Sequence, residues 1–260
     1  MALTARDAYD ATGAAWEAGP GLVYNRLAEV IVAAAPVALE DRTVADLGAG
    51  TGAASRAIAA AGGTPVAVDA ARGMLAAGAG TRAHAVQADI RSLPFRDGAF
   101  GGVVAAFSLN HVADTAAALR EAARVVESGG PLVASSYAEE DAHPVRGVVE
   151  TALGEAGWEP EPWQAELRTG PVARLSTADR CAAVAAAAGL SAQVRAVHVP
   201  FPGLRSPDLV AWRLGMAQHA PFVAGLTPPA ADRLRRRALE LLGDDPPPLI
   251  RSILIIAALA

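Results

Sequence analysis

The sequence contains no lysine: all 22 of its basic side chains belong to arginine. This absence excludes a phosphate-binding loop that ends in lysine, a pyridoxal cofactor held as a lysine Schiff base, and a lysine general base. The single cysteine, Cys181, excludes an intrachain disulfide and fits a reducing compartment. It lies in an alanine-rich segment, and we expect it to be a small buried residue.

Net charge and the chain ends exclude two further kinds of partner. The net charge is −5 and no end of the chain is basic, which argues against nucleic acid as a ligand. The one dense positive run, Arg233 with residues 235–237, is interpreted as a solvated helix face. The first residues lack the apolar core of a signal peptide, and the apolar run 253–260 is too short to cross a bilayer. We therefore expect a cytoplasmic protein without a membrane partner.

Motifs for several chemistries are also missing. No pair of His, Cys, Asp or Glu has the spacing of a metal site, so we predict no metal. No Gly-x-Ser-x-Gly nucleophile elbow occurs. With 260 residues, of which 52% are hydrophobic, the chain is long and apolar enough for one large α/β domain with an additional element.

Residues 43–52, TVADLGAGTG, are the most informative stretch that is present. They begin as an apolar run typical of a buried strand and end in three glycines spaced two apart, before the helix-permissive residues 53–61. A strand, a glycine turn and a helix open a nucleotide-binding βαβ unit, where glycines admit a ligand that a Cβ would exclude and the helix N-terminus offers N–H groups. The spacing differs from the dinucleotide fingerprint G-x-G-x-x-G. Asp46, just before the turn, would repel a pyrophosphate but suits an amino group.

From residue 43 onward, short apolar runs alternate with helical segments. After the first strand, further strands are predicted at 65–68, 83–88, 101–107, 131–136, 193–201 and 251–259. The strongest helix has Asp114 as its N-cap and Leu119 in its apolar stripe, and Gly129-Gly130 is predicted to end it. Such alternation predicts a parallel sheet covered by helices on both faces.

Residues 44–52 resemble motif I of the class I S-adenosylmethionine (SAM)-dependent methyltransferases, in particular small-molecule enzymes with a core like that of the ubiquinone and menaquinone methyltransferases. Three further stretches, at Asp69, at Asp89-Ile90 and at 107–112, fall where that family would put them. The resemblance spans roughly residues 20–137. It implies an α/β fold: a Rossmann-like, doubly wound seven-stranded sheet in the order 3-2-1-4-5-7-6, with strand 7 antiparallel and with a helical lid and cap.

The same resemblance divides the chain and implies an activity. The implied parts are an N-terminal helical lid over 1–42, a SAM-binding core over 43–137, a linker with a helix and the sixth strand over 138–202, a helical cap over 203–248 and the final strand over 249–260. The implied activity is methyl transfer from SAM to O, N or C of a small, fairly apolar acceptor, with S-adenosylhomocysteine (SAH) as product. The chain would act on a small molecule as a monomer or homodimer.

Several residues become candidates for holding the cofactor. Asp69 follows the second strand 21 positions after Gly48, where an acidic residue would bind two ribose hydroxyls, although the same separation suits NAD. In the resembling family, the residue at Asp89 accepts a hydrogen bond from the adenine amino group, and its neighbour, here Ile90, packs on the ring. The other residues that the resemblance assigns to the cofactor are Asp46, Gly48, Ala49, Gly50, Ala70, Phe107 and Ser108. The family usually has an aspartate where Gly102 stands, which puts the turn into strand four in question.

Candidates for catalysis and acceptor binding come from the segment after strand four and from the lid and cap. His111 is the candidate general base, because its ordinary pKa is near neutrality; the alternative is a histidine that orients the loop or touches the cofactor. The candidate acceptor contacts are Trp16, Tyr24, Tyr137, His143, Trp212, Met216 and His219. Helical spacing would place the last three on one face, and Trp212 fits core packing equally well.

Three functions remain open at this point. The favoured one is a SAM-dependent methyltransferase. Asp69 would also suit an NAD-linked oxidoreductase, and Gly102 leaves room for a SAM-fold protein that does not transfer methyl groups, such as a cyclase or a binding partner. Methyl transfer needs little beyond placement, because the sulfonium is already activated, so the favoured function does not require an identifiable catalytic residue.

Overall fold

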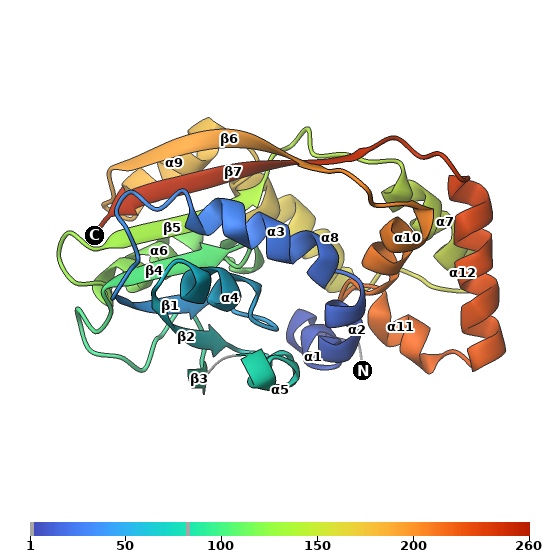
Figure 1. Cartoon of the computed structure of the whole chain (residues 1–260), viewed down its shortest axis with the longest axis horizontal. Coiled ribbons are helices and arrows are strands. Elements are labelled where there is room, and N and C mark those ends of the chain that lie inside the picture. Colours follow the sequence, from blue (N-terminus) through green and yellow to red (C-terminus); the bar gives the residue numbers. More distant parts are fainter. Residues whose placement is uncertain (1–2, 82–83) are drawn as a thin grey trace.

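The computed structural model describes residues 3–81 and 84–260 and contains a seven-stranded sheet with a group of helices beyond one end (Figure 1). The strands are β1 (Thr43–Leu47), β2 (Thr64–Asp69), β3 (His84–Gln87), β4 (Gly102–Ala106), β5 (Pro131–Tyr137), β6 (Ala192–Phe201) and β7 (Leu249–Leu259). Their order is β3-β2-β1-β4-β5-β7-β6, and β7 runs antiparallel to both of its neighbours. The strand order and the antiparallel seventh strand predicted from the resemblance are confirmed. The predicted first residue of β3, Ala83, lies outside the described residues.

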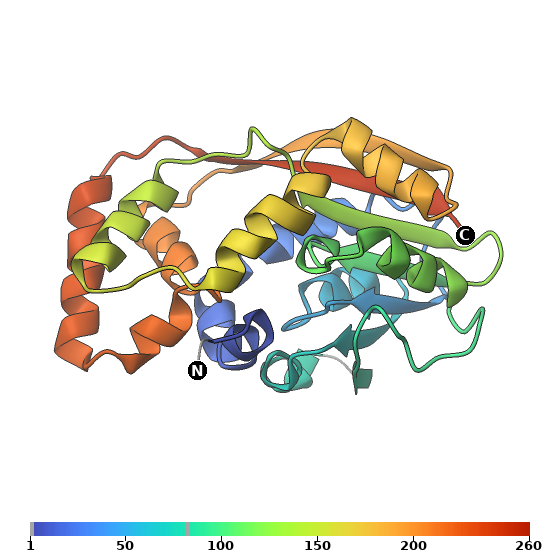
Figure 2. The ribbon, with the colours of Figure 1, turned by 180° about the vertical axis from the view of Figure 1, so that it is seen from behind.

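Helices cover both faces of the sheet because the side chains of each strand alternate between two apolar cores (Figures 1 and 2). Val44 and Val104 belong to one core, and Ala45 and Val103 belong to the other. The covering helices are α3 (Gly21–Val32) and α4 (Ala53–Ala60) on the first face, with α6 (Thr115–Arg124) and α9 (Ala178–Ala187) on the second. Cys181 of α9 is fully buried, as predicted.

Helix α6 begins as predicted but ends earlier. The Asp114 carboxylate accepts a hydrogen bond from the Ala117 N–H at 2.9 Å, so this residue is the N-cap. The helix ends at Arg124, not at Gly129-Gly130. The cause is a competing set of bonds: the Phe100 N–H donates to the carbonyl of residue 125, and the carbonyl of Phe100 accepts from the N–H of residue 127. These bonds pull the chain out of the helix and alongside the entry to β4.

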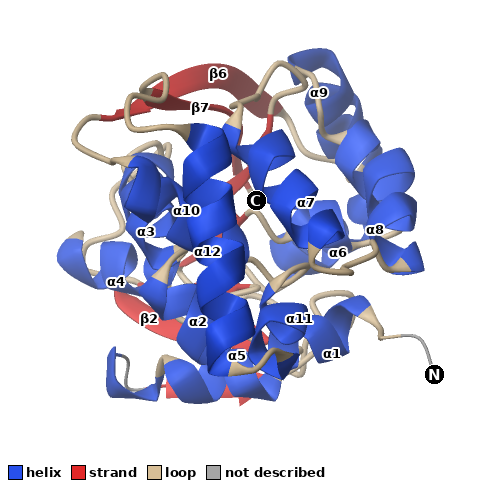
Figure 3. Cartoon of the chain, turned by 90° about the vertical axis from the view of Figure 1, so that its right-hand side faces the viewer, coloured by secondary structure: helices blue, strands red, loops and turns tan. Residues whose placement is uncertain are grey.

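A helical cap lies beyond the edge of the sheet at which β5 ends and β7 begins (Figures 1 and 3). Its helices are α7 (Val145–Glu155), α10 (Ser206–Leu214), α11 (Ala220–Gly225) and α12 (Pro228–Leu242), and α8 (Pro162–Leu167) with η3 (Arg168–Val172) follows α7 in the chain. Helix α12 packs against both α7 and α10. The cap therefore includes α7, which lies outside the range 203–248 predicted for it.

The N-terminal helices α1 (Ala5–Asp10) and α2 (Gly13–Ala18) lie between α5 (Arg72–Ala77) and α10, and η1 (Ala79–Thr81) follows α5. Glycines allow both contacts. A Cβ at Gly73 would lie 1.9 Å from the carbonyl oxygen of Asp10, and one at Gly19 would lie 2.3 Å from that of Ala211. Backbone thus touches backbone on both sides, so the predicted lid helices are packed closely between the core and the cap.

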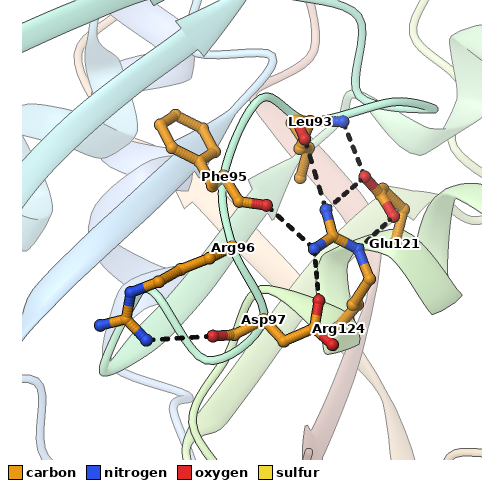
Figure 4. A network of polar contacts seen from close by, with 6 residues as sticks. All are labelled: Leu93, Phe95, Arg96, Asp97, Glu121 and Arg124. Atoms are coloured by element: carbon orange, nitrogen blue, oxygen red, sulfur yellow. Dashed lines mark hydrogen bonds and ion pairs between the residues drawn. The ribbon is translucent and has the colours of Figure 1, made fainter.

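A polar network holds the segment that leads into β4 (Figure 4). The guanidinium of Arg124 donates to the carbonyl oxygens of Phe95 at 2.9 Å and Leu93 at 3.3 Å, and to the carboxylate of Asp97 at 2.7 Å. The Glu121 carboxylate pairs with Arg124 and accepts the Leu93 N–H at 2.7 Å. One turn of α6 therefore fixes both ends of the segment 93–97.

This network explains how the turn forms with Gly102 in place of an aspartate. A Cβ at Gly102 would lie 3.1 Å from Pro131 Cγ and 3.2 Å from the Pro131 carbonyl oxygen, so any larger residue would press on β5. The chain just before Gly102 is held by other groups, because the Gly101 N–H donates to the Thr43 carbonyl and the Gly101 carbonyl accepts from Arg42. The turn is therefore supported without a carboxylate at position 102.

We expect Arg124→Met to lower the free energy of unfolding by about 1–3 kcal/mol, because two backbone carbonyls and Asp97 lose a charged donor. Urea denaturation measures the loss. Arg120→Met on the same helix is the matched control. The Arg120 side chain donates to the Ala187 carbonyl, so this substitution should lower the free energy of unfolding by less. Equal losses in the two variants would contradict a specific role for Arg124.

Candidate functional site

The turn after β1 brings the backbone close to the segment after β4. Gly48, Gly50 and Gly52 have φ angles of +72°, +54° and +95°, which favour glycine. The N–H groups of residues 48 and 49 both donate to the Val68 carbonyl, which fastens the turn to β2. A Cβ at Gly48 would lie 2.3 Å from the Cβ of Ser108. The two loops touch at this point, where the order of strands reverses in a doubly wound sheet.

Two aspartates that end strands are held in place by short hydrogen bonds. Asp46 is buried at the end of β1, and its carboxylate accepts the Ser55 hydroxyl of α4 at 2.6 Å. At the end of β2, the carboxylate of Asp69 accepts the N–H groups of Gly50 and Ala71, each at 2.8 Å. Asp69 therefore ties the glycine turn to β2 and is itself fixed beside it.

The third aspartate, Asp89, forms an ion pair at the rim of the site. Its carboxylate binds the Arg91 side chain at 3.0 and 2.5 Å and accepts the Arg91 N–H at 2.9 Å. Hydrogen bonding to Arg91 lowers the pKa of Asp89, so the carboxylate is charged near neutral pH. The pair is half-exposed, and a ligand that binds Asp89 would compete with Arg91 for its oxygens.

All three aspartates line one cavity of about 850 Å³. This volume is within the range of about 300–1,000 Å³ that is usual for small-molecule sites. The ten residues predicted to hold the cofactor all lie in its wall: Asp46, Gly48, Ala49, Gly50, Asp69, Ala70, Asp89, Ile90, Phe107 and Ser108. The structure thus brings together residues from four separate strand ends.

The segment after β4 carries a strained residue and the candidate base. Phe107 has a φ of +54°, a left-handed conformation that is unfavourable for a bulky side chain. The short helix η2 (Leu109–His111) follows. The His111 ring faces the cavity, within hydrogen-bond distance of the Tyr9 hydroxyl (Nε2 to Oη, 3.3 Å). The protein around this ring disfavours the imidazolium and lowers the pKa of His111 to about 4.

Aromatic side chains from the lid and the core form a continuous wall at this end of the cavity. The ring of Tyr9 lies 5.8 Å from Trp16, which lies 4.9 Å from Tyr24. Tyr24 meets the Phe107 ring edge-on at 5.5 Å, and Phe107 stacks on Tyr137 at 4.4 Å. Burial raises the pKa of Tyr9, Tyr24 and Tyr137, so these phenols stay protonated. Three of the predicted acceptor contacts, Trp16, Tyr24 and Tyr137, are therefore in the wall.

The structure places the other predicted acceptor contacts away from the cavity. His143 caps the start of α7, where its Nδ1 accepts the Val145 N–H and its Nε2 lies 2.8 Å from the Pro247 carbonyl. His219 is completely buried, with Nδ1 2.8 Å from the Arg213 carbonyl and its ring edge-on to Trp158. Burial lowers the pKa of His219 to about 3, so the ring is neutral.

Trp212 and Met216 belong to the apolar core that joins the cap to the sheet, and their side chains are 3% and 8% exposed. The single helical face predicted for Trp212, Met216 and His219 does not form, because α10 ends at Leu214. At Gly215 a Cβ would lie 2.5 Å from Pro20 Cδ, so the chain turns where it meets the lid.

Several residues of the wall were not singled out from the sequence, among them Arg6, Tyr9 and Asn110. Tyr9 stands in the same leader as Trp16, so its aromatic character was a usable signal. Asn110 is adjacent to His111, but a lone asparagine carries no pattern. Its Oδ1 is buried without a hydrogen-bond partner among the described residues, as is the Oγ of Ser108. Buried polar atoms are normally satisfied, so both point to a ligand.

Two kinds of feature are absent from the described parts of the chain. Within residues 3–81 and 84–260, no group of three or more His, Cys, Asp or Glu side chains could hold a metal ion. Over the same ranges, no helix has the length and apolar character needed to cross a membrane.

The sequence of residues 45–134 matches a family described as a methyltransferase domain. The matched range contains the glycine turn, Asp69, Asp89 and the segment after β4, which all lie in the cavity wall. Residues 45–134 form a class I SAM-dependent methyltransferase domain. The lid and cap of the chain lie outside this methyltransferase domain.

Part of the chain is similar in sequence to known methyltransferases. The demethylmenaquinone methyltransferase of Mycolicibacterium gilvum is 42% identical over 112 residues, which are 43% of this chain and 47% of that protein. The chain thus spans about half the length of the curated relatives it matches.

Similar solved structures include phosphoethanolamine N-methyltransferase 2 of Haemonchus contortus in complex with phosphomonomethylethanolamine and SAH. It has a TM-score of 0.58 at 16% identity, over 98% of this chain and 60% of that one. The cyclase SpnF has a TM-score of 0.55 at 18% identity, over 99% and 97% of the two chains. Identities this low show a shared fold, and the activity of the chain has to be argued from its own site.

Gly48→Ala is expected to weaken SAH binding about tenfold or more, because the added Cβ strains a left-handed backbone and displaces the Ser108 loop. Isothermal titration calorimetry measures the Kd. Gly147→Ala in α7 is the matched control: beyond the backbone of its own helix, a Cβ there meets no atom of the described residues within 4 Å, and the Kd should not change. Unchanged affinity in the Gly48 variant would show that the glycine turn does not hold the cofactor.

Proposed function

We propose that the chain transfers a methyl group from SAM to a small, fairly apolar acceptor. The observation that supports this most is the convergence of Asp46, Asp69 and Asp89 on one cavity that includes the glycine turn. Each carboxylate is an acceptor for the donors of an adenosyl sulfonium ligand: its amino group, its ribose hydroxyls and its adenine amino group. A pyrophosphate in the same place would be repelled by Asp46.

The residues present fit such a ligand in two further respects. Gly48 and Gly50 line the cavity with left-handed backbones that favour glycine, so this part of the wall is formed by backbone and not by side chains. The buried Ser108 Oγ and Asn110 Oδ1 in the wall have no hydrogen-bond partner in the described part of the chain, so a bound molecule would satisfy them. Asp46, the glycine turn and Ser108 would hold the amino-acid part, and Asp69, Asp89 and Ile90 the adenosyl part.

When bound, SAM supplies a methyl group that its sulfonium already activates. The contribution of the chain is to align the acceptor with that group and to exclude water. Tyr9 and Trp16 of the lid and Phe107 and Tyr137 of the core enclose the acceptor end with rings. Such walls favour an apolar acceptor, which is consistent with relatives named for demethylmenaquinone.

His111 is the group best placed to accept a proton from the acceptor. Its lowered pKa leaves the ring neutral near pH 7, and a neutral imidazole can take the proton that a hydroxyl or an amine loses. The Tyr9 hydroxyl lies at hydrogen-bond distance from Nε2 and orients the ring. The lid therefore closes the cavity and positions the base through one residue.

The proposal predicts ligand preference and label transfer. Titration should show that the chain binds SAH and not NADH, because the site combines carboxylates with a glycine turn unsuited to a pyrophosphate. With methyl-labelled SAM, a panel of phenols, quinols and amines should contain at least one acceptor that takes up the label. Binding of NADH without SAH would support an oxidoreductase. SAH binding with no transfer to any acceptor would support a SAM-fold protein such as a cyclase.

The proposal also predicts the pH dependence. The folded-state pKa of His111 is lowered from 6.5 to about 4, so its neutral form is present above that value and lost as the pH falls through it. We expect kcat/KM to show no inflection near the ordinary histidine pKa. His111→Gln should lower kcat by about 10²–10⁴-fold and leave the Kd for SAH close to wild type. Full activity in this variant would assign His111 to loop orientation or cofactor contact instead.

A further inference from the structure

Four side chains from separate parts of the chain form a stack that begins in the cavity wall and extends into the cap. Phe107 follows β4, Tyr137 ends β5, Arg251 lies on β7 and Trp212 lies on α10. The rings of Phe107 and Tyr137 are 4.4 Å apart and inclined by 21°. The Arg251 guanidinium carbon lies 4.1 Å from the Tyr137 ring centre and 4.8 Å from that of Trp212. At such short distances Phe107 and Arg251 must occupy opposite faces of Tyr137.

The guanidinium of Arg251 is held rigidly in this stack because Nε and Nη2, along one of its edges, both donate to a carboxylate. The carboxylate of Asp141 accepts from Nε at 3.0 Å and from Nη2 at 2.5 Å, and it also accepts the Ser252 N–H at 2.8 Å. Both partners of the ion pair are buried, each with 9% of the side chain exposed. A planar guanidinium held at its edge leaves both faces available to rings, which an ammonium group does not.

The residue at the cavity end of the stack needs such support. The left-handed backbone of Phe107 is strained, and such strain persists only where the surroundings enforce it. The Phe107 N–H donates to the Ser135 hydroxyl at 3.1 Å, and the stacked Tyr137 holds its ring. Ser108, the next residue, is in contact range of Gly48. The position of Phe107 therefore sets the shape of the wall at the acceptor end and, through Ser108, beside the glycine turn.

We propose that Arg251 and Trp212 are positioning residues, which act through Tyr137 on Phe107 and so make the shape of the ligand cavity depend on the docking of cap helix α10. Neither residue lines the cavity. The same helix meets the lid where Ala211 contacts Gly19, so it supports the cavity from two sides. The identity of the ligand in this proposal rests on the proposed function.

Substitutions separate stacking from charge and from bulk. Arg251→Lys keeps a cation beside Asp141 but removes the planar guanidinium, and Trp212→Leu removes the outer ring. Trp212→Phe keeps a ring, and it removes no hydrogen bond, because the Trp212 Nε1 makes none within the described residues. We expect Arg251→Lys and Trp212→Leu to raise the Kd for SAH about tenfold and Trp212→Phe to remain near wild type. Amide hydrogen exchange over residues 104–112 of the ligand-free chain should be faster in the first two variants alone.

Arg237→Met is the matched control, because it breaks an exposed ion pair with Glu155 on the cap without touching the stack. A purely structural role would lower Tm and leave the Kd unchanged at temperatures where the chain is folded. Wild-type exchange and wild-type Kd in folded Arg251→Lys and Trp212→Leu would overturn the proposal, and either variant suffices if the other does not fold. If the wild-type chain binds no SAH, the proposed function fails, whereas faster exchange over 104–112 in the variants still supports the coupling.

Discussion

The contact between Gly48 and Ser108 is the constraint on which the rest of the site depends. It lets the turn after β1 touch the segment after β4, and no residue with a Cβ could occupy the first position without moving the second. Asp69 then fastens the same turn to β2 through the Gly50 N–H. With these two contacts the ends of β1, β2 and β4 converge, and Asp46 and Asp69 face the same cavity as Asp89, which follows β3.

The cavity has two chemically different ends. Carboxylates and backbone groups of the core surround one end, whereas rings and the neutral His111 surround the other. The second end is built mostly by the lid and by residues that the cap supports. This division explains why the matched methyltransferase domain, residues 45–134, includes the cofactor side of the proposed site but not the whole acceptor side. Differences between acceptors in such folds would arise in the lid and cap.

The acceptor candidates show where reasoning from residue type failed. Residue type and helical spacing predict His143, His219, Trp212 and Met216 as acceptor contacts, but the structure places them away from the cavity. The structure uses them for packing: His219 is fully buried against Trp158, and Trp212 covers the Arg251 guanidinium. Helix α10 ends at Leu214, and the next residue, Gly215, packs against Pro20 of the lid, which lies almost 200 residues earlier in the chain. No local pattern contains that information.

The strands, the glycine turn and the three aspartates could be predicted from the sequence alone, because strand periodicity, glycine spacing and carboxylates at strand ends are local properties of the chain. The strand order was implied by the resemblance to a known family. Tertiary structure alone decided the pairing of Tyr9 with His111, the substitution of an Arg124 network for the aspartate expected at Gly102, and the stack from Phe107 to Trp212. Each of these joins residues far apart in the chain. Their proximity follows from how helices pack on the finished sheet, and helix packing depends on the shapes of both partners at once.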